Sequence, residues 1–177
     1  DLLKLPWTAD QSGPKGSIAQ KMFGAVADSE VFVTPMAAVA GAVADEMLET
    51  MLVEAKKPDS CIDHLRKIYV NNGGDIAFWL NEGESFSIGV VDNPQIPELN
   101  AKVSLAHESQ VRGIATSGWR GRSLSLGIAD AVTVLAKSAA VADVAATLIA
   151  NEVIVDFPGI EKRPASEVKD DSDLGMI

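Results

Sequence analysis

The stretch Ile68-Tyr69-Val70-Asn71-Asn72-Gly73-Gly74-Asp75-Ile76-Ala77-Phe78-Trp79-Leu80 predicts two strands joined by a tight turn. β-Branched and aromatic residues favour strands on both sides of the glycine pair. Glycine permits positive φ and has no Cβ to keep a ligand away, so Gly73 and Gly74 could form a plain turn or a place where backbone approaches a ligand. Asp75 could contact that ligand or cap the turn through its own backbone.

The elements expected around this hairpin do not alternate between strand and helix. Helices are predicted over 17–27, 36–53 and 138–151, the first and last with Ser17 and Ser138 as N-caps. Further strands are predicted over 30–34, 86–91, 102–105, 110–115 and 131–136. The strand 86–91 is expected to pair back on the hairpin through the connection 81–84. This order predicts an α+β fold with an antiparallel sheet packed against alanine-rich helices.

The 177 residues are enough for one compact domain, expected over 1–158, followed by a charged C-terminal arm over 159–177. Hydrophobic residues make up 47% of the chain but aromatic residues only 5%, so the core is expected to consist of small aliphatic side chains. Small side chains let helices approach closely, and a homo-oligomer formed through the alanine-rich helices is therefore compatible with the sequence.

The formal net charge of -10 argues against nucleic acid as a partner, because such binding depends on an excess of Lys and Arg. It does not exclude a phosphate ligand, which backbone N–H groups and a divalent cation can hold. No apolar run reaches the ~20 residues needed to cross a bilayer, so no membrane association is expected. The lone Cys61 excludes an intramolecular disulfide, and a cytoplasmic location is expected, although a leader could precede Asp1.

A second motif, Thr116-Ser117-Gly118, follows a predicted strand and precedes Trp119, Arg120 and Arg122. Hydroxyl groups, backbone N–H groups and arginines at a strand end could bind an anion. The alternative is an exposed polar loop. Trp119 could stack on a ring system or simply fill space.

A third motif places Asp143 and Thr147 four residues apart on the last predicted helix, so that they share a face. A carboxylate in so apolar a helix costs free energy unless it is paired or bound to a cation. Magnesium prefers a few protein oxygens together with substrate phosphates, which this pair would suit. Taken alone, the motif is better explained by an aspartate in the N-terminal half of a helix that interacts with the helix dipole.

In order and spacing these motifs resemble those of the ApbE-type FAD:protein FMN transferases. That family carries an Asn-Leu-Gly-Gly-Asp-Ile turn, a Val-Gly-Ile-x-Asp-Pro strand, an Ala-Thr-Ser-Gly segment and an Ala-Asp-Ala-x-Ala-Thr helix. The matching segments here are 71–76, 88–94, 115–118 and 142–147, and the segment 41–45 resembles the family's Gly-Tyr-Ala-Val-Asp helix. The resemblance covers roughly residues 34–151.

The resemblance implies a T-fold-like architecture and an FAD molecule whose pyrophosphate is held with Mg²⁺. It implies that Asp143 and Thr147 are the metal ligands and that FMN is transferred to a Ser or Thr hydroxyl of a target protein. We expect the nucleotide to contact Asn72, Gly73, Gly74, Asp75, Thr116, Ser117 and Gly118.

The chain also departs from the family's pattern, and no catalytic residue is predicted. Ala40 stands where the family has a lysine, residues 34–37 replace its Asp-Leu-Gly-Gly segment, and 123–130 occupy the place of its His-x-x-Asp-Pro-x-x-Gly segment. These departures fit a compact branch of ApbE-like proteins. They leave open a non-catalytic nucleotide-binding or assembly module on the same fold.

Overall fold

The computed structural model describes residue 5 and the ranges 13–60, 64–91, 98–121 and 123–168. The remaining residues lie outside these ranges, among them Cys61, Arg122, 92–94 of the family-like segment 88–94, and 169–177 of the predicted arm. The described chain has the predicted α+β class, with antiparallel sheets and a few helices. No helix within the described ranges combines the length and apolarity needed to span a bilayer.

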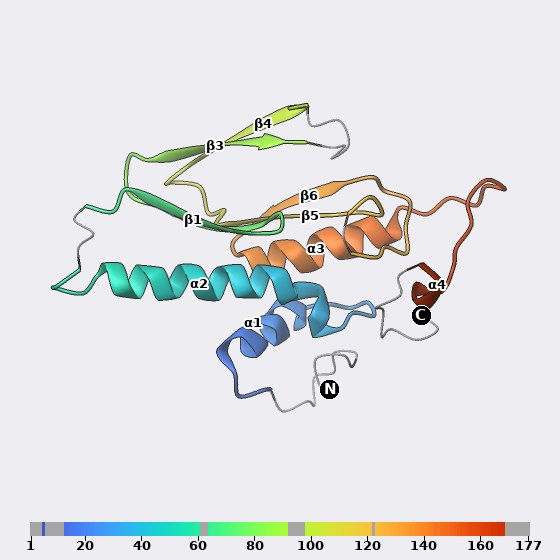
Figure 1. Cartoon of the computed structure of the whole chain (residues 1–177), viewed down its shortest axis with the longest axis horizontal. Coiled ribbons are helices and arrows are strands. Elements are labelled where there is room, and N and C mark those ends of the chain that lie inside the picture. The colour runs from blue at the N-terminus through green and yellow to red at the C-terminus, as the bar shows by residue number, and fades with distance from the viewer. Residues whose placement is uncertain (1–4, 6–12, 61–63, 92–97, 122, 169–177) are drawn as a thin grey trace.

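A four-stranded antiparallel sheet lies at the centre of the structure, in the order β1-β2-β5-β6 (Figure 1). Its strands are β1 (Lys67–Asn72), β2 (Asp75–Leu80), β5 (Gly113–Ser117) and β6 (Val132–Ala136). β1 and β2 form the predicted hairpin, in which Asn72 lies opposite Asp75. Gly73 and Gly74 make the turn with φ angles of 72° and 113°, which other residues adopt only with strain.

A second, two-stranded sheet covers one face of the main sheet. It consists of β3 (Ser85–Val90) and β4 (Ala101–Ala106), which pair with each other. Leu105 of β4 packs with Phe78 and Ile114 of the main sheet, and the Phe86 ring meets the Phe78 ring edge-on at 5.7 Å. The predicted pairing of 86–91 back on β2 is therefore wrong, because β1 and β5 occupy both edges of β2.

The helices cover the opposite face of the main sheet (Figure 1). α2 (Val39–Ala55) packs on β1 and β2, whereas α3 (Ala139–Glu152) packs on β5 and β6. α1 (Ser17–Val26) lies outside them, with Met22 and Val26 buried against Ala42 and Val144. A 3₁₀ turn, η2 (Pro35–Ala38), precedes α2, and the short α4 (Ala165–Val168) lies within the predicted arm.

Two local predictions are corrected by the structure. The segment 30–34 is not a strand; it runs without a strand partner into η2. Ser17 is not an N-cap, since Gly16 holds that position and the Ser17 hydroxyl donates to Glu46 Oε1 at 2.7 Å. The Ser138 cap is confirmed, because its Oγ accepts a hydrogen bond from the Val141 N–H at 3.3 Å. The division at residue 158 stays a prediction.

Candidate functional site

The first turns of α2 and α3 lie against each other, and the two helices run in opposite directions from this crossing (Figure 1). Gly41 makes the approach possible. A Cβ at that position would lie 2.3 Å from the carbonyl oxygen of Ala139 and 2.7 Å from the nitrogen of Ala140, both of which are backbone atoms. The absence of a side chain at Gly41 therefore sets the distance between the helices.

Each helix supplies a carboxylate to the N-terminus of the other. Asp45 of α2 accepts hydrogen bonds from the N–H groups of Ala139 at 3.0 Å and Ala140 at 2.9 Å. Asp143 of α3 accepts one through Oδ2 from the N–H of Gly41 at 3.0 Å. Helix N-termini leave N–H groups without partners and carry partial positive charge, so this exchange stabilises both ends.

Asp45 is a residue that the sequence analysis did not select. The sequence carries only a partial signal for it: the tetrapeptide Ala-Val-Ala-Asp occurs three times, at 25–28, 42–45 and 140–143. The copies at 42–45 and 140–143 lie near the starts of α2 and α3, and each ends with the aspartate that reaches the other helix. The copy at 25–28 lies at the end of α1, so the tetrapeptide alone does not identify the pair.

The two carboxylates have different electrostatic surroundings. Burial raises the pKa of Asp143 to about 6, against the opposing effect of the N–H groups of Gly41 and Ala40. Burial also raises the pKa of Asp45, opposed by the N–H groups at the start of α3 and by the positive charge of Lys21. Lys21 Nζ forms its salt bridges with Glu49 and Glu46, and neither Asp45 nor Asp143 forms one within the described part of the chain. The charge of Glu49 also raises the pKa of Asp45.

The glycine turn is joined to this crossing by one side chain. Asn72 donates through Nδ2 to the carbonyl oxygen of Ala40 at 3.0 Å. That carbonyl and the N–H of Gly41, which donates to Asp143, belong to the same peptide unit. The peptide between Ala40 and Gly41 is therefore held from both sides, by the β1–β2 hairpin and by α3.

The faces of the sheet separate the predicted ligand-binding residues. Asn72 and Asp75 share the helix-side face with Val70 and Ala77, and Oδ1 of Asp75 is buried. Alternation along β5 puts Ser117 on that face with Ala115, which packs against α3.

Thr116 faces the other way, and its hydroxyl lies 2.9 Å from the hydroxyl of Thr133. The β2–β5 register, with Ile76 opposite Ile114, nevertheless places the end of β5 beside the glycine turn. The backbone of Thr116 therefore lies beside the glycine turn, whereas its side chain points to the face of the sheet opposite Asn72 and Asp75.

The helix-side group, which we call the Asp143 corner, consists of Ala40, Gly41, Asn72, Asp75 and Asp143. Thr147 is half-buried and lies one turn further along α3 than Asp143. Among the described residues, no three His, Cys, Asp or Glu side chains gather as a metal-binding group. The carboxylate and the hydroxyl would need additional oxygens, from phosphate or water, to complete the coordination of Mg²⁺.

The loop after β5 is fixed by contacts to Asp130. Gly118 has a φ of 155°, and a Cβ there would lie 2.4 Å from the Asp130 carbonyl oxygen. Trp119 Nε1 and Arg120 Nε donate to Asp130 Oδ1 at 2.7 and 2.9 Å, and the Arg120 guanidinium lies 4.6 Å from the Trp119 ring centre. Trp119 is half exposed and held in place. Its stacking on a ligand ring stays a prediction.

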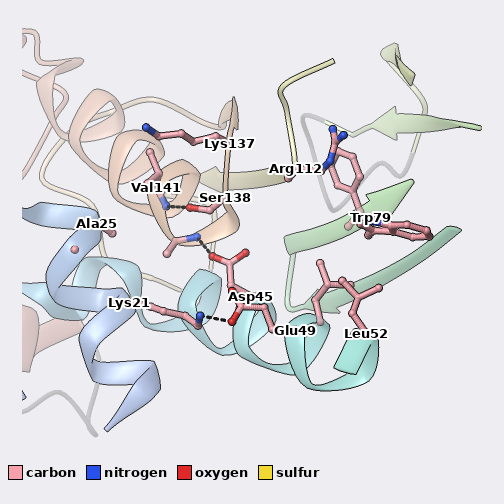
Figure 2. A pocket seen from close by; sticks show the side chains of 14 residues that line it. Lys21, Ala25, Asp45, Glu49, Leu52, Trp79, Arg112, Lys137, Ser138 and Val141 are labelled. Carbon is pink, nitrogen blue, oxygen red and sulfur yellow. Dashed lines mark hydrogen bonds and ion pairs between the residues drawn. The ribbon is translucent and has the colours of Figure 1, made fainter. Parts of the chain in front are cut away.

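A pocket of about 370 Å³ lies on the Asp45 side of the crossing (Figure 2). Phe78 and Trp79 of β2 line it, whereas the glycine turn does not. The Lys21–Glu49 ion pair borders it on one side, and Trp79 and Arg112 border it on the other. None of the predicted nucleotide-binding or metal-binding residues lines it. Arg112 donates to the carbonyl oxygens of His107, Ser109 and Val111.

Comparison with known proteins gives a family and a group of relatives. A family model described as "AbpE bacteria" matches residues 1–177. A UPF0280 protein of Methanobrevibacter smithii is 37% identical over 138 residues, which cover 77% of this chain and 52% of the relative. UPF0280 proteins of Methanopyrus kandleri and Methanosphaerula palustris are 35% and 38% identical over 139 and 151 residues, covering 78% and 84% of this chain and 51% and 56% of theirs.

The chain thus spans about half the length of these curated relatives. No solved structure matches it significantly.

Proposed function

This chain belongs to the AbpE bacteria family, and on that premise we propose that it binds FAD together with Mg²⁺ at the Asp143 corner. The family name is related to that of the ApbE-like proteins. The four ordered motifs resemble those of the ApbE-type FAD:protein FMN transferases, which supports the same assignment. Two of those motifs, the glycine turn and the Asp143 helix, meet at the Ala40–Gly41 peptide.

The observation that carries the proposal is the contrast between Asp143 and Asp45. Both cap the opposite helix, and burial raises the pKa of both. α1 places the ammonium group of Lys21 near Asp45, where it forms ion pairs with Glu49 and Glu46. Neither aspartate forms an ion pair among the described residues, but the charge of Lys21 lowers the pKa of Asp45, whereas at Asp143 only backbone N–H groups oppose the effect of burial. A half-buried carboxylate in such surroundings favours a cation from solution.

Asp143 and Thr147 would hold the metal through a carboxylate and a hydroxyl oxygen, which are the ligand types that Mg²⁺ prefers. When bound, Mg²⁺ would neutralise part of the charge on the pyrophosphate of FAD. The turn at Gly73 and Gly74 would let the ligand approach the backbone, with Asp75 and Ser117 on the same face of the sheet. Gly118 and the backbone of Thr116 would contribute N–H groups at the end of β5.

Transfer of FMN is the finer part of the proposal. In that reaction a Ser or Thr hydroxyl of a target protein attacks the FMN phosphorus, the bond to the AMP leaving group breaks, and the hydroxyl proton passes to a base. Ala40 replaces the lysine of the resembled family, and 123–130 replace its histidine-containing segment. We therefore assign ligand-binding roles to this chain's residues and no catalytic base.

The test is FAD binding by Asp143→Asn, which removes the charge but keeps an oxygen that can accept from the Gly41 N–H. We expect binding that depends on Mg²⁺ in the unchanged protein and its loss in this variant. Asp28→Asn is the control, because it removes an exposed carboxylate that lies after α1, outside the predicted site. Equal Mg²⁺-dependent binding by Asp143→Asn and the unchanged protein would overturn the assignment.

A non-catalytic module is the second candidate, and the helix exchange favours it. Both oxygens of Asp45 and one of Asp143 already satisfy backbone N–H groups, so a structural role can account for both residues. If the unchanged protein binds neither FAD nor another nucleotide with Mg²⁺, this candidate replaces the first.

A further inference from the structure

We propose that Asn72 is a positioning residue for Asp143, and that it acts through the peptide unit between Ala40 and Gly41. The inference rests on the proposed function, since it assigns to Asn72 control over the Mg²⁺ affinity of the Asp143 corner. Asn72 would exert this control without contacting the metal.

The hydrogen bonds form a continuous chain from the sheet to the carboxylate. Asn72 Nδ2 donates to the Ala40 carbonyl at 3.0 Å, and the Gly41 N–H of the same peptide donates to Asp143 Oδ2 at 3.0 Å. A peptide unit is planar, so a bond that fixes the direction of its carbonyl also fixes the direction of its N–H. The side chain of Asn72 thereby orients the donor that holds Asp143.

The neighbouring contacts restrict how this peptide can respond if the Asn72 bond is lost. Gly41 lies against the backbone of Ala139, with no space for even a methyl group on that side. Asp45 binds the N–H groups of Ala139 and Ala140, which fixes that part of α3 in turn. The Ala40–Gly41 peptide also belongs to the first turn of α2, so loss of the Asn72 donor would allow it a small tilt and not a free rotation. This tilt would move the Gly41 N–H away from Asp143.

The same turn contains a matched control. Asn71 accepts a hydrogen bond from the Gly74 N–H through Oδ1 at 2.9 Å, and it is exposed. Asn71→Ala removes one side-chain hydrogen bond from the hairpin, as Asn72→Ala does, but leaves the Ala40 carbonyl untouched. A difference between the two variants therefore separates positioning of Asp143 from general weakening of the turn.

The experiment measures the dissociation constant of Mg²⁺ at a fixed FAD concentration for the unchanged protein, Asn72→Ala and Asn71→Ala. Outer hydrogen-bond partners of metal ligands typically change metal affinity by ~10–100-fold. Because Asn72 acts through an intervening peptide, we expect about a tenfold weakening in Asn72→Ala and less than a twofold change in Asn71→Ala.

In EDTA, where no metal contributes to stability, both substitutions should lower the melting temperature by similar amounts. If Asn72→Ala does not fold, Asn72→Thr takes its place, since it suits a strand but is too short to reach the Ala40 carbonyl. Equal Mg²⁺ affinities in the Asn72 and Asn71 variants would overturn the inference while leaving the proposed function standing. Absence of Mg²⁺-dependent FAD binding in the unchanged protein would overturn both.

Discussion

The side chain of Asp143 combines a structural and a chemical property. It accepts the Gly41 N–H, which helps to begin α2, and its half-buried position disfavours its own negative charge. The raised pKa of about 6 means that the folded protein holds a proton on Asp143 more tightly than the unfolded chain does. A bound cation would relieve this cost, and so would replacement of the carboxylate by a neutral amide.

This difference predicts a pH dependence of stability in the presence of EDTA. A folded pKa of about 6 above the ordinary value of 3.8 adds stability that is present below pH 3.8 and is lost as the pH rises through 6. We expect the free energy of unfolding of the unchanged protein to fall by about 1–2 kcal/mol relative to Asp143→Asn between pH 4 and pH 7, allowing for solvent screening. Urea denaturation at both pH values measures this change. A difference between the two proteins that does not vary with pH would contradict the account.

The sequence was informative about Asp143 and much less so about its partners. The spacing of Asp143 and Thr147 and the apolar character of their helix indicated an unusual carboxylate. The Gly41 N–H that binds Asp143 lies 102 positions away in the chain. Local patterns do not report such pairs. The two helices share the tetrapeptide Ala-Val-Ala-Asp, at 42–45 and 140–143, but it also occurs at 25–28 and therefore does not single out this pair.

At the scale of elements, the crossing of α2 and α3 depends on Gly41. Gly41→Ala would place a methyl group 2.3 Å from a backbone oxygen, so the helices would have to separate. We expect a loss of about 2–3 kcal/mol in the free energy of unfolding. Gly24→Ala is the control: it lies on the exposed side of α1 with no atom within 4 Å of the new methyl, and should gain about 0.5–1 kcal/mol. Equal effects of the two substitutions would contradict the close approach.

Because Asp45 of α2 accepts from two N–H groups at the start of α3, we expect α3 to depend more on α2 than on its own N-cap. Asp45→Ala removes the partner of two N–H groups at the start of α3, and we expect it to cost about 2 kcal/mol. Ser138→Ala removes a single, longer bond of 3.3 Å and should cost about 1 kcal/mol or less. Urea denaturation of both variants tests this order. A larger loss in Ser138→Ala would show that the local cap dominates.

The elements that were predicted correctly are those defined by local signals. The β1–β2 hairpin has its glycine turn, and α3 has its serine cap and alanine-rich sequence. The turn at 81–84 is visible in the local sequence and suggested that β3 pairs with β2. That β5 occupies this edge of β2 is not visible locally, because β5 is distant in the chain, and the predicted partner of β3 was therefore wrong. The segment 30–34 has residues suited to a strand but pairs with no strand in the described structure.

At the scale of the whole molecule, the layers create two distinct regions around the helix crossing. The pocket beside Asp45 is bordered by α1 and its lysine (Figure 2), whereas the Asp143 corner is joined to the β1–β2 turn through Asn72. The Asp143 corner combines residues from 40 to 143, and it forms only when the hairpin and both helices are assembled. Fold class was predictable from the order of elements, but this assembly was not.

The most direct test of the account is isothermal titration of the unchanged protein with FAD, FMN and ADP, each in Mg²⁺ and in EDTA. FAD and ADP carry a pyrophosphate, whereas FMN carries a single phosphate. The account predicts that FAD binds in Mg²⁺, that EDTA abolishes or strongly weakens this binding, and that ADP shows the same dependence more weakly. FAD binding of equal strength in Mg²⁺ and in EDTA, or no binding of any of the three ligands, would contradict the central claim that Asp143 holds a magnesium-bound nucleotide.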